Sequence, residues 1–571
     1  MELNVQKMQH LKEKPFYLTD EDIRWVSETL ADMTDEEKTA QLFCLIAYES
    51  DTDYLTKLAK EVKPGGLMCR PMPAASSREV TGTLQKHSRI PMLIAANLER
   101  GGVGIMEEGT SLGSHMAVAA TDKDETAARL GTLCGREGAA VGANWSFAPI
   151  IDIDYNFRNP ITNIRTFGSD PDRVKRMGVE YVKALQKEGL AASIKHFPGD
   201  GVDERDQHLV TSVNTMSCDE WDATFGEAYK ACIDAGAMTV MIGHISHPAY
   251  SRKLNPGVRD EDIMPASLAY ELTTTLLKEQ LGFNGLVVTD ATTMAGMTIP
   301  MLREKAVPLT IAVGCDMFLF TKNVDEDFAY MRKGIEEGVI TPERLKEALI
   351  KILGLKAALG LHKKQAEGNL QPTGEVLEKE EHIRWSKECA DESITLVKEE
   401  KGVLPITPAK YKKVLVYPIE SEEGFAYGVR VGAVQVFTDA LKKEGFDVDV
   451  FEASQGYEGM MQPYSEVTGK YDLMLYIANL ATRSNQTTIR IEWTMPFGAN
   501  VPIYMESIPT IFISVENPYH LLDVPRVKTF INTYASTDTI LEALMDKLTG
   551  RSEFKGTSPV DAFCGMWDTR L

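Results

Sequence analysis

The sequence lacks the features that mark several large classes of protein. It contains no run of about 18 apolar residues, so no membrane-spanning helix is predicted. Residues 1–25 have no apolar core after a basic start, and we therefore expect no secretory signal peptide. The eight cysteines form no CxxC pair and lie mostly in apolar stretches such as residues 42–45, which disfavours structural zinc. We expect buried reduced thiols, a cytoplasmic protein, and no metal or cofactor.

Positive charge is also in short supply. Lys and Arg number 61 against 83 Asp and Glu, which gives a formal net charge of −22. Nucleic acids and anionic membranes repel an acidic surface, so neither is expected as a partner. The charge identifies no substrate, and the sequence leaves the oligomeric state open.

The chain has the composition of a soluble globular protein, with 43% hydrophobic and 25% charged residues, and its 571 residues predict two domains. Short apolar runs separated by amphipathic helical segments fill the first part of the chain. Eight of these runs are predicted strands: 44–48, 65–69, 92–97, 146–154, 191–197, 237–245, 285–290 and 316–321. Such uniformly apolar strands pair in parallel with both faces covered, and eight of them close a (β/α)₈ barrel.

A second α/β pattern follows a polar stretch at residues 363–381, which we interpret as a linker, and a predicted helix at 382–397. Its five apolar runs predict a smaller open parallel sheet covered by helices: 413–419, 447–453, 471–480, 509–517 and 528–535. The expected domains are a barrel at 1–362, a linker and connecting helix at 363–398, and an αβα sandwich at 399–571.

Polar and charged side chains follow the ends of the predicted barrel strands, where reactive groups lie in such barrels. These residues are Arg70, Asn97, Glu99, Asp152, Asp154, Lys195, His196, His244 and Asp290. A ring of carboxylates, imidazoles and cations suits a polyhydroxylated substrate, because hydroxyl groups need both acceptors and charged donors. Asp290 closes the run GLVVTD and is either the cap of the next helix or a nucleophile for sugar chemistry.

The loop KHFPGDGVDERDQH, residues 195–208, concentrates titratable groups. Within it Asp206 precedes His208 by two residues, a pairing in which a carboxylate orients a catalytic imidazole. A solvated acidic loop is the commoner setting for an isolated pair of this kind. A calcium loop is disfavoured, because the acidic residues lack the alternate spacing and the distal Glu of an EF-hand.

The combination of KHFPG with D-x-H, in which Asp206 lies eleven residues after Lys195, resembles the β-N-acetylglucosaminidase branch of glycoside hydrolase family three. Other segments resemble the same branch: FAPIIDID (147–154), NPITNIRTFGSDP (159–171), GLVVTDATTMAG (285–296), ESITLVKEEKGVLPI (392–406) and residues 532–561. The resemblance covers nearly the whole chain, and the loop and GLVVTD are specific in combination.

The resemblance implies a retaining glycosidase in which Asp290 is the nucleophile and His208, oriented by Asp206, is the general acid/base. An imidazole beside a carboxylate nucleophile avoids like-charge repulsion, and it titrates near neutral pH without burial. Closure of the loop that carries the pair is expected to gate the cycle.

The sugar-binding residues implied by the same match are Lys195, His196 and Arg165, and Arg70 joins them as a strand-end cation. His244, in MIGHI, is either a further contact or a packing residue. Asn97 stands where the family usually has an Asp that binds the 4- or 6-hydroxyl, which leaves the sugar preference open at this position. Asp200 replaces the family's usual His in KHFPGHG.

The leading hypothesis is hydrolysis of terminal β-linked N-acetylhexosamine, above all N-acetylglucosamine from cell-wall or chitin-type fragments. One alternative is a β-glucosidase or β-xylosidase of the same fold, although those branches usually take their acid/base Glu from the second domain. Another is a β-N-acetylglucosaminide phosphorylase, because a His acid/base does not repel phosphate as a carboxylate does. A non-catalytic sugar-binding protein is disfavoured, since the nucleophile and the dyad are all present.

Overall fold

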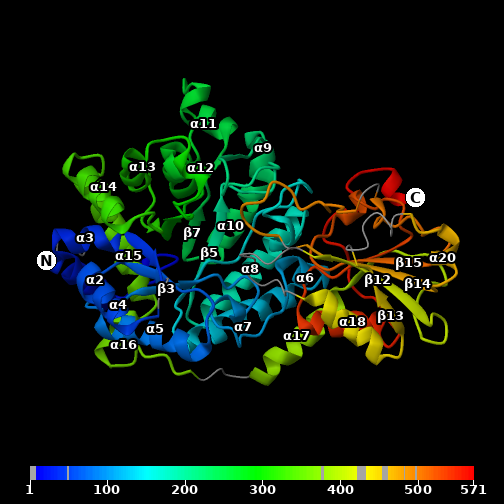
Figure 1. Ribbon diagram of the computed structural model, residues 1–571. Coiled ribbons are helices and arrows are strands. Elements are labelled where there is room, and N and C mark those ends of the chain that lie inside the picture. The colour runs from blue at the N-terminus through cyan, green and yellow to red at the C-terminus, as the bar shows by residue number, and fades with distance from the viewer. Residues whose placement is uncertain are drawn as a thin grey trace. The chain divides into compact units, whose positions relative to one another are not determined.

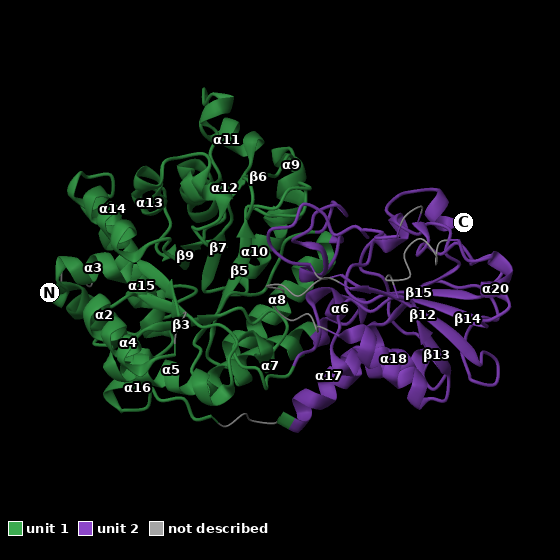
Figure 2. Cartoon of the chain, viewed as in Figure 1, with its two compact units in different colours: residues 1–110, 127–153, 171–379 green, residues 111–126, 154–170, 380–571 purple. Residues whose placement is uncertain are grey.

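The computed structural model describes residues 8–47, 50–374, 379–420, 432–452, 461–480, 482–495 and 498–571. Its contacts divide the chain into two compact units, which Figure 2 colours separately. Unit 1 comprises residues 1–110, 127–153 and 171–379, and unit 2 comprises residues 111–126, 154–170 and 380–571. Two stretches from the first part of the chain therefore belong to the C-terminal unit. The domain boundaries expected at 362 and 398 stay predictions.

Unit 1 is the predicted barrel. Figure 1 shows its strands at the centre with helices around them, and the parallel strands run in the order β10-β1-β2-β3-β4-β5-β7-β9. A bridge between Val288 and Met317 links the two end strands. The strands are β1 (Phe43–Ile46), β2 (Gly66–Met68), β3 (Leu93–Ala96), β4 (Trp145–Ser146), β5 (Ala191–Phe197), β7 (Thr239–Ile242), β9 (Leu286–Thr289) and β10 (Phe318–Leu319). The (β/α)₈ fold is confirmed.

Seven of the eight strands agree with the sequence to within a few residues, although residue 48 of the first predicted strand lies outside the described residues. The fourth is much shorter than the predicted 146–154. The chain still runs beside β5 after Ser146, because the Ser193 amide donates to Ala148 O and the Ile151 amide donates to Lys195 O. Pro149 lies between these contacts and has no amide hydrogen, so the ladder is interrupted there.

Helices alternate with the strands of unit 1. The α-helices are α2 (Asp20–Asp32), α3 (Asp35–Gln41), α4 (Thr52–Lys57), α5 (Ala74–His87), α7 (Asp124–Ala140), α8 (Pro171–Lys187), α9 (Cys218–Trp221), α10 (Glu227–Asp234), α11 (Pro248–Leu254), α12 (Ala295–Thr298), α13 (Arg303–Ala312), α14 (Val324–Glu336), α15 (Pro342–Ala358) and α16 (Leu361–Ala366). Helix α8 shows why the pattern folds this way. Pro171 starts it, Val174, Met177 and Tyr181 are buried along one face, and Gly189 follows it at a φ of 87°.

Two amphipathic segments of unit 1 form irregular helices. The segment 265–283 forms a 3₁₀ turn, Ala266–Leu268, followed by the π-helix Glu271–Gln280. The segment 218–236 is split by the π-helical turn Asp222–Gly226. A further π-helical turn, Leu58–Val62, extends α4. The sequence pattern indicates a helical face and does not distinguish these forms.

Unit 2 contains a six-stranded sheet in the order β11-β16-β15-β14-β12-β13. The strands are β11 (Thr395–Lys398), β12 (Lys413–Glu420), β13 (Asp447–Val450), β14 (Leu473–Asn479), β15 (Thr510–Ser514) and β16 (Thr529–Asn532). All pairs are parallel except β11 with β16, which is antiparallel. The predicted sheet was wholly parallel, so the expectation is corrected to a mixed sheet.

The missed strand β11 was predicted as the end of a helix at 382–397. Helix α17 (Lys379–Ser393) stops before it, and the β-branched Ile394, Thr395 and Val397 favour extended chain. The predicted linker at 363–381 was also too long, since α16 and the start of α17 occupy parts of it. Residues 375–378 of that linker lie outside the described residues.

Both faces of the second sheet are covered. One core contains Phe437 and Leu441 of α18 (Ala433–Lys443) and Leu544 of α21 (Asp538–Leu548). The other is rich in aromatic side chains, and Tyr417, Tyr476, Phe512 and Phe530 stack along it in sequence. Two further α-helices among the described residues of the unit are α6 (His115–Ala120) and α20 (Tyr464–Thr468). Among the residues that the structure describes, no helix is long and apolar enough to cross a bilayer.

Candidate active site

The carboxyl ends of the barrel strands carry a group of buried ionisable side chains. Lys195, near the end of β5, is 2% exposed, and its ammonium donates to Glu99 Oε1 at 2.9 Å, just past β3. Because a buried ammonium needs a counter-charge, Glu99 supplies it. The Lys195 predicted to hold sugar hydroxyls is thus already paired with a carboxylate at the barrel mouth.

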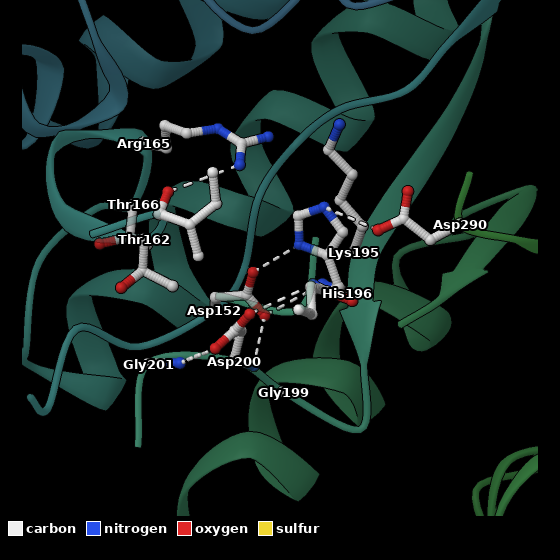
Figure 3. Close-up of polar contacts among 12 residues, drawn as sticks. Asp152, Thr162, Arg165, Thr166, Lys195, His196, Gly199, Asp200, Gly201 and Asp290 are labelled. Atoms are coloured by element: carbon white, nitrogen blue, oxygen red, sulfur yellow. Dashed lines mark hydrogen bonds and ion pairs between the residues drawn. The ribbon is translucent and has the colours of Figure 1, made fainter. Parts of the chain in front are cut away.

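His196 follows directly and lies between two carboxylates, as Figure 3 shows. Its Nδ1 is 2.7 Å from Asp152 Oδ2, and its Nε2 is 3.8 Å from Asp290 Oδ2. The backbone amide of His196 also donates to Asp152 Oδ1 at 3.0 Å. A carboxylate accepts only, so Asp152 places a proton on Nδ1 and leaves Nε2 directed at Asp290.

Asp290 comes directly after β9. Its backbone amide donates to Ile242 O at 2.8 Å, and the Ala291 amide donates to its Oδ1 at 2.7 Å. Burial acts to raise the pKa of Asp290, but the charge interaction with His196, aided by the other nearby imidazoles and by the Ala291 amide, outweighs it and lowers the pKa. The group is therefore held as a carboxylate, the form that a nucleophile needs.

The predicted dyad is present in the loop after β5. His208 Nδ1 lies 2.6 Å from Asp206 Oδ1, and the same oxygen accepts the His208 backbone amide at 2.9 Å. The side chain of Asp206 is fully buried, whereas that of His208 is 27% exposed. The buried carboxylate fixes the ring and its Nδ1 proton, so Nε2 is the nitrogen left for proton transfer.

This loop is fastened to the segment that follows Asp290. The Ala295 amide donates to His208 O at 3.0 Å, and the Gly296 amide donates to Gln207 O at 3.2 Å. In return Thr211 Oγ1 donates to Gly296 O at 2.7 Å. The dyad and the Asp290 segment are therefore joined by three hydrogen bonds within one unit.

His244, which we left open between sugar contact and packing, is completely buried after β7. Its Nε2 donates to Ala291 O at 3.1 Å, and its Nδ1 lies 2.9 Å from Ser267 Oγ. Burial lowers its pKa, and the carbonyl of Ala291, which only accepts, places a ring proton on Nε2. With both nitrogens bonded inside the protein, His244 supports the residue after Asp290, which favours the packing alternative.

The other predicted sugar-binding residues, Asn97, Arg70 and Arg165, make none of the hydrogen bonds described above. Asn97 is exposed directly after β3, and Arg70 is half-buried shortly after β2, both in unit 1. Arg165 belongs to unit 2, where it ends the 3₁₀ turn Asn163–Arg165. Its guanidinium reaches Ile161 O at 3.5 Å, a contact drawn in Figure 3.

The segment that carries Arg165 is held by residues of the C-terminal part of unit 2. Tyr519 and Thr162 donate from their hydroxyls to the two oxygens of Asp154. Asn163 Nδ2 donates to Asn517 Oδ1 at 3.1 Å. Asp154, predicted as a member of the ring of strand-end groups, therefore serves as an anchor inside unit 2.

Sequence reasoning named Asp152 and Glu99 as strand-end residues but gave them no role, and it missed Gln207 and Ser267 altogether. The strand-end position was the available signal for the first two. No local signal marks the other two, because both bond to His244, which lies 37 residues from Gln207 and 23 residues from Ser267 along the chain. Within the described ranges, no group of three or more His, Cys, Asp or Glu residues is placed to hold a metal ion.

Comparison with known proteins identifies the family. The model of the glycosyl hydrolase family 3 N-terminal domain matches residues 34–355. A β-N-acetylglucosaminidase/β-glucosidase of Cellulomonas fimi is 57% identical over 560 residues, which cover 98% of this chain and 99% of the relative. The chain belongs to glycosyl hydrolase family 3.

Two solved structures are similar to this family 3 enzyme over nearly its whole length. A protein described as β-glucoside phosphorylase BglX superimposes with a TM-score of 0.91 at 45% identity, over 98% of this chain and 100% of the other. A family 3 β-N-acetylglucosaminidase from Paenibacillus shares the fold, with a TM-score of 0.77 at 24% identity over 94% of this chain. The resemblance inferred from the loop and from GLVVTD is confirmed at the level of the family.

Proposed function

We propose that this family 3 enzyme cleaves terminal β-linked N-acetylglucosamine and β-glucosides with retention, using Asp290 as nucleophile and the Asp206–His208 dyad as acid/base. The observation that carries the proposal is the joined arrangement of these groups: a carboxylate whose pKa is lowered, and an imidazole fixed at 2.6 Å from a buried carboxylate on a loop bonded to the same segment. The Cellulomonas relative, named for both activities, supports the choice of sugars.

In the first step an oxygen of Asp290 attacks the anomeric carbon, and the bond to the leaving oxygen breaks. His208, protonated on Nε2, gives that proton to the leaving oxygen, so the aglycone departs neutral and a glycosyl ester of Asp290 remains. Asp206 stabilises the imidazolium before the transfer and keeps the second ring proton on Nδ1.

In the second step the neutral His208 removes a proton from the acceptor, which attacks the anomeric carbon and breaks the ester to Asp290. With water as acceptor the product is the free sugar. The two inversions together give retention, and His208 returns to its protonated state.

Phosphate is the second candidate acceptor. The solved structure described as a β-glucoside phosphorylase is 45% identical over nearly the whole of both chains, which favours it. An acid/base carboxylate in the glycosyl-enzyme would repel phosphate, whereas a neutral imidazole does not. With phosphate the product is the sugar 1-phosphate, formed by the same two steps.

The sugar itself is proposed to be held by Lys195, His196 and Arg70 of unit 1, with Asn97 directly after β3, whereas the role of Arg165 in unit 2 stays a prediction. Lys195 and Glu99 offer a donor and an acceptor side by side, a combination that suits neighbouring hydroxyls. Asn97 offers one carbonyl oxygen where a carboxylate would offer two, which weakens discrimination at the hydroxyl it faces.

The test is a panel of aryl β-glycosides with N-acetylglucosamine, glucose and xylose, measured for free sugar and for sugar 1-phosphate with and without phosphate. Asp290→Ala should lower kcat/KM for every substrate by about a thousandfold or more, since covalent catalysis is lost. Retention of most of the activity would overturn the proposal. The ratio of the two products decides between water and phosphate as the natural acceptor.

A further inference from the structure

Gln207, the residue inside the dyad, is 1% exposed, and its neighbours Asp206 and Asp200 are buried as well. A primary amide in such a place must have all of its polar atoms satisfied, because an unpaired buried donor or acceptor is costly. The structure supplies partners on two different strands, and their identity gives Gln207 a role.

The side-chain amide of Gln207 has one possible orientation. Its Nε2 donates to Asp200 Oδ2 at 3.1 Å, and its Oε1 accepts the His244 backbone amide at 2.8 Å. A carboxylate accepts and a backbone N–H donates, so a flipped amide would lose both bonds. Gln207 therefore bridges the end of β5, through Asp200, to the end of β7, through His244.

Each of these partners is connected to the reacting groups. The Asp200 backbone amide donates to Asp152 Oδ1 at 2.8 Å, the oxygen that also accepts the His196 amide. His244 holds the carbonyl of Ala291, the residue after Asp290. The dyad is thus attached on one side to the His196 support and on the other to the nucleophile segment.

The loop also packs closely against Gly296. The Gly296 amide bonds to Gln207 O, and a Cβ built at Gly296 would lie 2.5 Å from that carbonyl oxygen. Only glycine permits the approach without displacing the loop. Gln207 is therefore held by hydrogen bonds and by close packing at once.

We propose that Gln207 is a positioning residue that holds the Asp206–His208 dyad in reach of the leaving oxygen, through a matched amide–carboxylate pair with Asp200. The proposal rests on the proposed role of His208. It gives a role to Asp200, which stands where the family usually has His: Asp200 accepts from Gln207, and each requires the hydrogen-bonding character of the other.

The pair can be exchanged without changing its shape. Gln207→Glu places two carboxylates against each other, and Asp200→Asn places two amide donors against each other, so each single change should release the loop. In Asp200→Asn/Gln207→Glu the new amide donates to the new carboxylate. The carboxylate introduced at position 207 still accepts from His244. The amide oxygen introduced at position 200 still accepts from the Gly201 amide, which lies 2.7 Å from Asp200 Oδ1 in the native protein.

The readout is kcat/KM for two N-acetylglucosaminides, one with a phenyl and one with a dinitrophenyl leaving group. Only the phenyl group needs strong protonation as it departs. Each single variant should lower kcat/KM for the phenyl substrate by about tenfold or more and for the dinitrophenyl substrate by far less, and the double variant should recover most of the loss. Gly296→Ala should give the same selective loss without altering the amide.

The matched control is Gln85→Glu. Gln85 is a 4% exposed amide that bonds to Met92 N and O at the opposite end of the barrel, so it should lower stability without selecting between the substrates. Equal losses for both substrates in Gln207→Glu, or no recovery in the double variant, would overturn the proposal. His208→Ala separates this from the proposed function: if it too shows no selectivity, the acid role itself fails.

Discussion

The imidazole of His196 lies between two carboxylates, Asp152 and Asp290, and interacts with each in a different way. Asp152 is 1% exposed and accepts from both the ring and the backbone of His196, whereas Asp290 lies 3.8 Å from the other nitrogen. At that distance there is no hydrogen bond, so His196 acts on Asp290 through its charge. Asp152 fixes the orientation of the ring, so a residue outside the proposed reaction holds His196 beside the candidate nucleophile.

We therefore expect Asp152→Asn to move the acid limb of the pH profile of kcat/KM to higher pH. His196 lowers the pKa of Asp290, and a ring that Asp152 no longer holds in place lowers it less. The pKa of Asp290 therefore rises, and its carboxylate is protonated at a higher pH on acidification. Misplacement of the ring should also lower kcat/KM at neutral pH by about ten- to a hundredfold. The profile is measured with an activated aryl glycoside.

The control is Asp219→Asn, which removes an equal charge from an exposed position on α9. It should leave both the limb and the rate unchanged. An acid limb that stays in place in Asp152→Asn would show that His196 does not tune Asp290.

The sequence predicted the candidate catalytic residues but not the residues that position them. The candidate nucleophile Asp290 and the candidate dyad of Asp206 and His208 were predicted from motifs, because such groups occur in short, recognisable sequence patterns. Gln207 and Ser267 were not, because a neutral polar residue gains its role only when two distant strands bring its partners together. His244 shows the same limit, since whether it faces a sugar or Ser267 depends on how the ring is turned.

At the scale of elements, the segment 154–170 combines two properties. It carries Arg165, and it is anchored by the buried Asp154, whose neighbours are Tyr519 and Thr162. Burial raises the pKa of Asp154 to about 6, and the two hydroxyls and the Asn163 amide oppose the rise. Near neutral pH the anchor is therefore an ionised carboxylate that depends on its donors.

Tyr519→Phe is expected to destabilise unit 2 by about 1–3 kcal/mol, because it leaves a buried carboxylate without one donor. The loss should be greater at about pH 8 than at about pH 5. Tyr519 lowers the pKa of Asp154, so the variant raises it further, and the protonated acid present at low pH needs the donor less. Urea unfolding at the two pH values measures the difference.

Tyr411→Phe is the matched control, since its hydroxyl donates to a neutral acceptor, Val403 O, at 3.2 Å in the same unit. Its cost should be the same at both pH values. Equal costs at both pH values for Tyr519→Phe would show that Asp154 does not titrate in this range.

Strand positions were well predicted from the sequence, because uniformly apolar runs between helices are a strong local signal. The errors in strand position occur where a local pattern fits more than one structure or where a single residue breaks it. Residues 146–154 are apolar over most of their length, yet β4 stops at Ser146 and Pro149 interrupts the ladder beyond it. Residues 395–397 follow a helix so closely that they were predicted as its end. The antiparallel direction of β11 has no local signal, since it depends on which edge of the sheet the chain reaches.

At the scale of the whole chain, unit 2 is assembled from three separate stretches. Ser114 Oγ donates to Tyr534 O at 2.8 Å, and the Ser169 amide donates to Pro559 O at 3.2 Å. One of its apolar clusters joins residues from all three: Met116, Ala117, Ala120, Ile164, Tyr519, Tyr534, Val560 and Cys564. The stretches 111–126 and 154–170 are thus part of the core of unit 2, although unit 1 surrounds them in sequence.

Residues 1–374 expressed alone should therefore fail to fold as a soluble barrel. They would retain residues 111–126 and 154–170 without the chain that buries them, which exposes Met116, Ala117 and Ile164 and leaves Asp154 without Tyr519. Co-expression with residues 375–571 should restore a soluble pair with aryl-glycosidase activity. Size-exclusion chromatography and turnover measure both outcomes, and the full chain cut by a protease at a site inserted after residue 374 serves as the control. A soluble, monomeric and fully active 1–374 fragment would show instead that unit 1 folds and works without the stretches completed by unit 2.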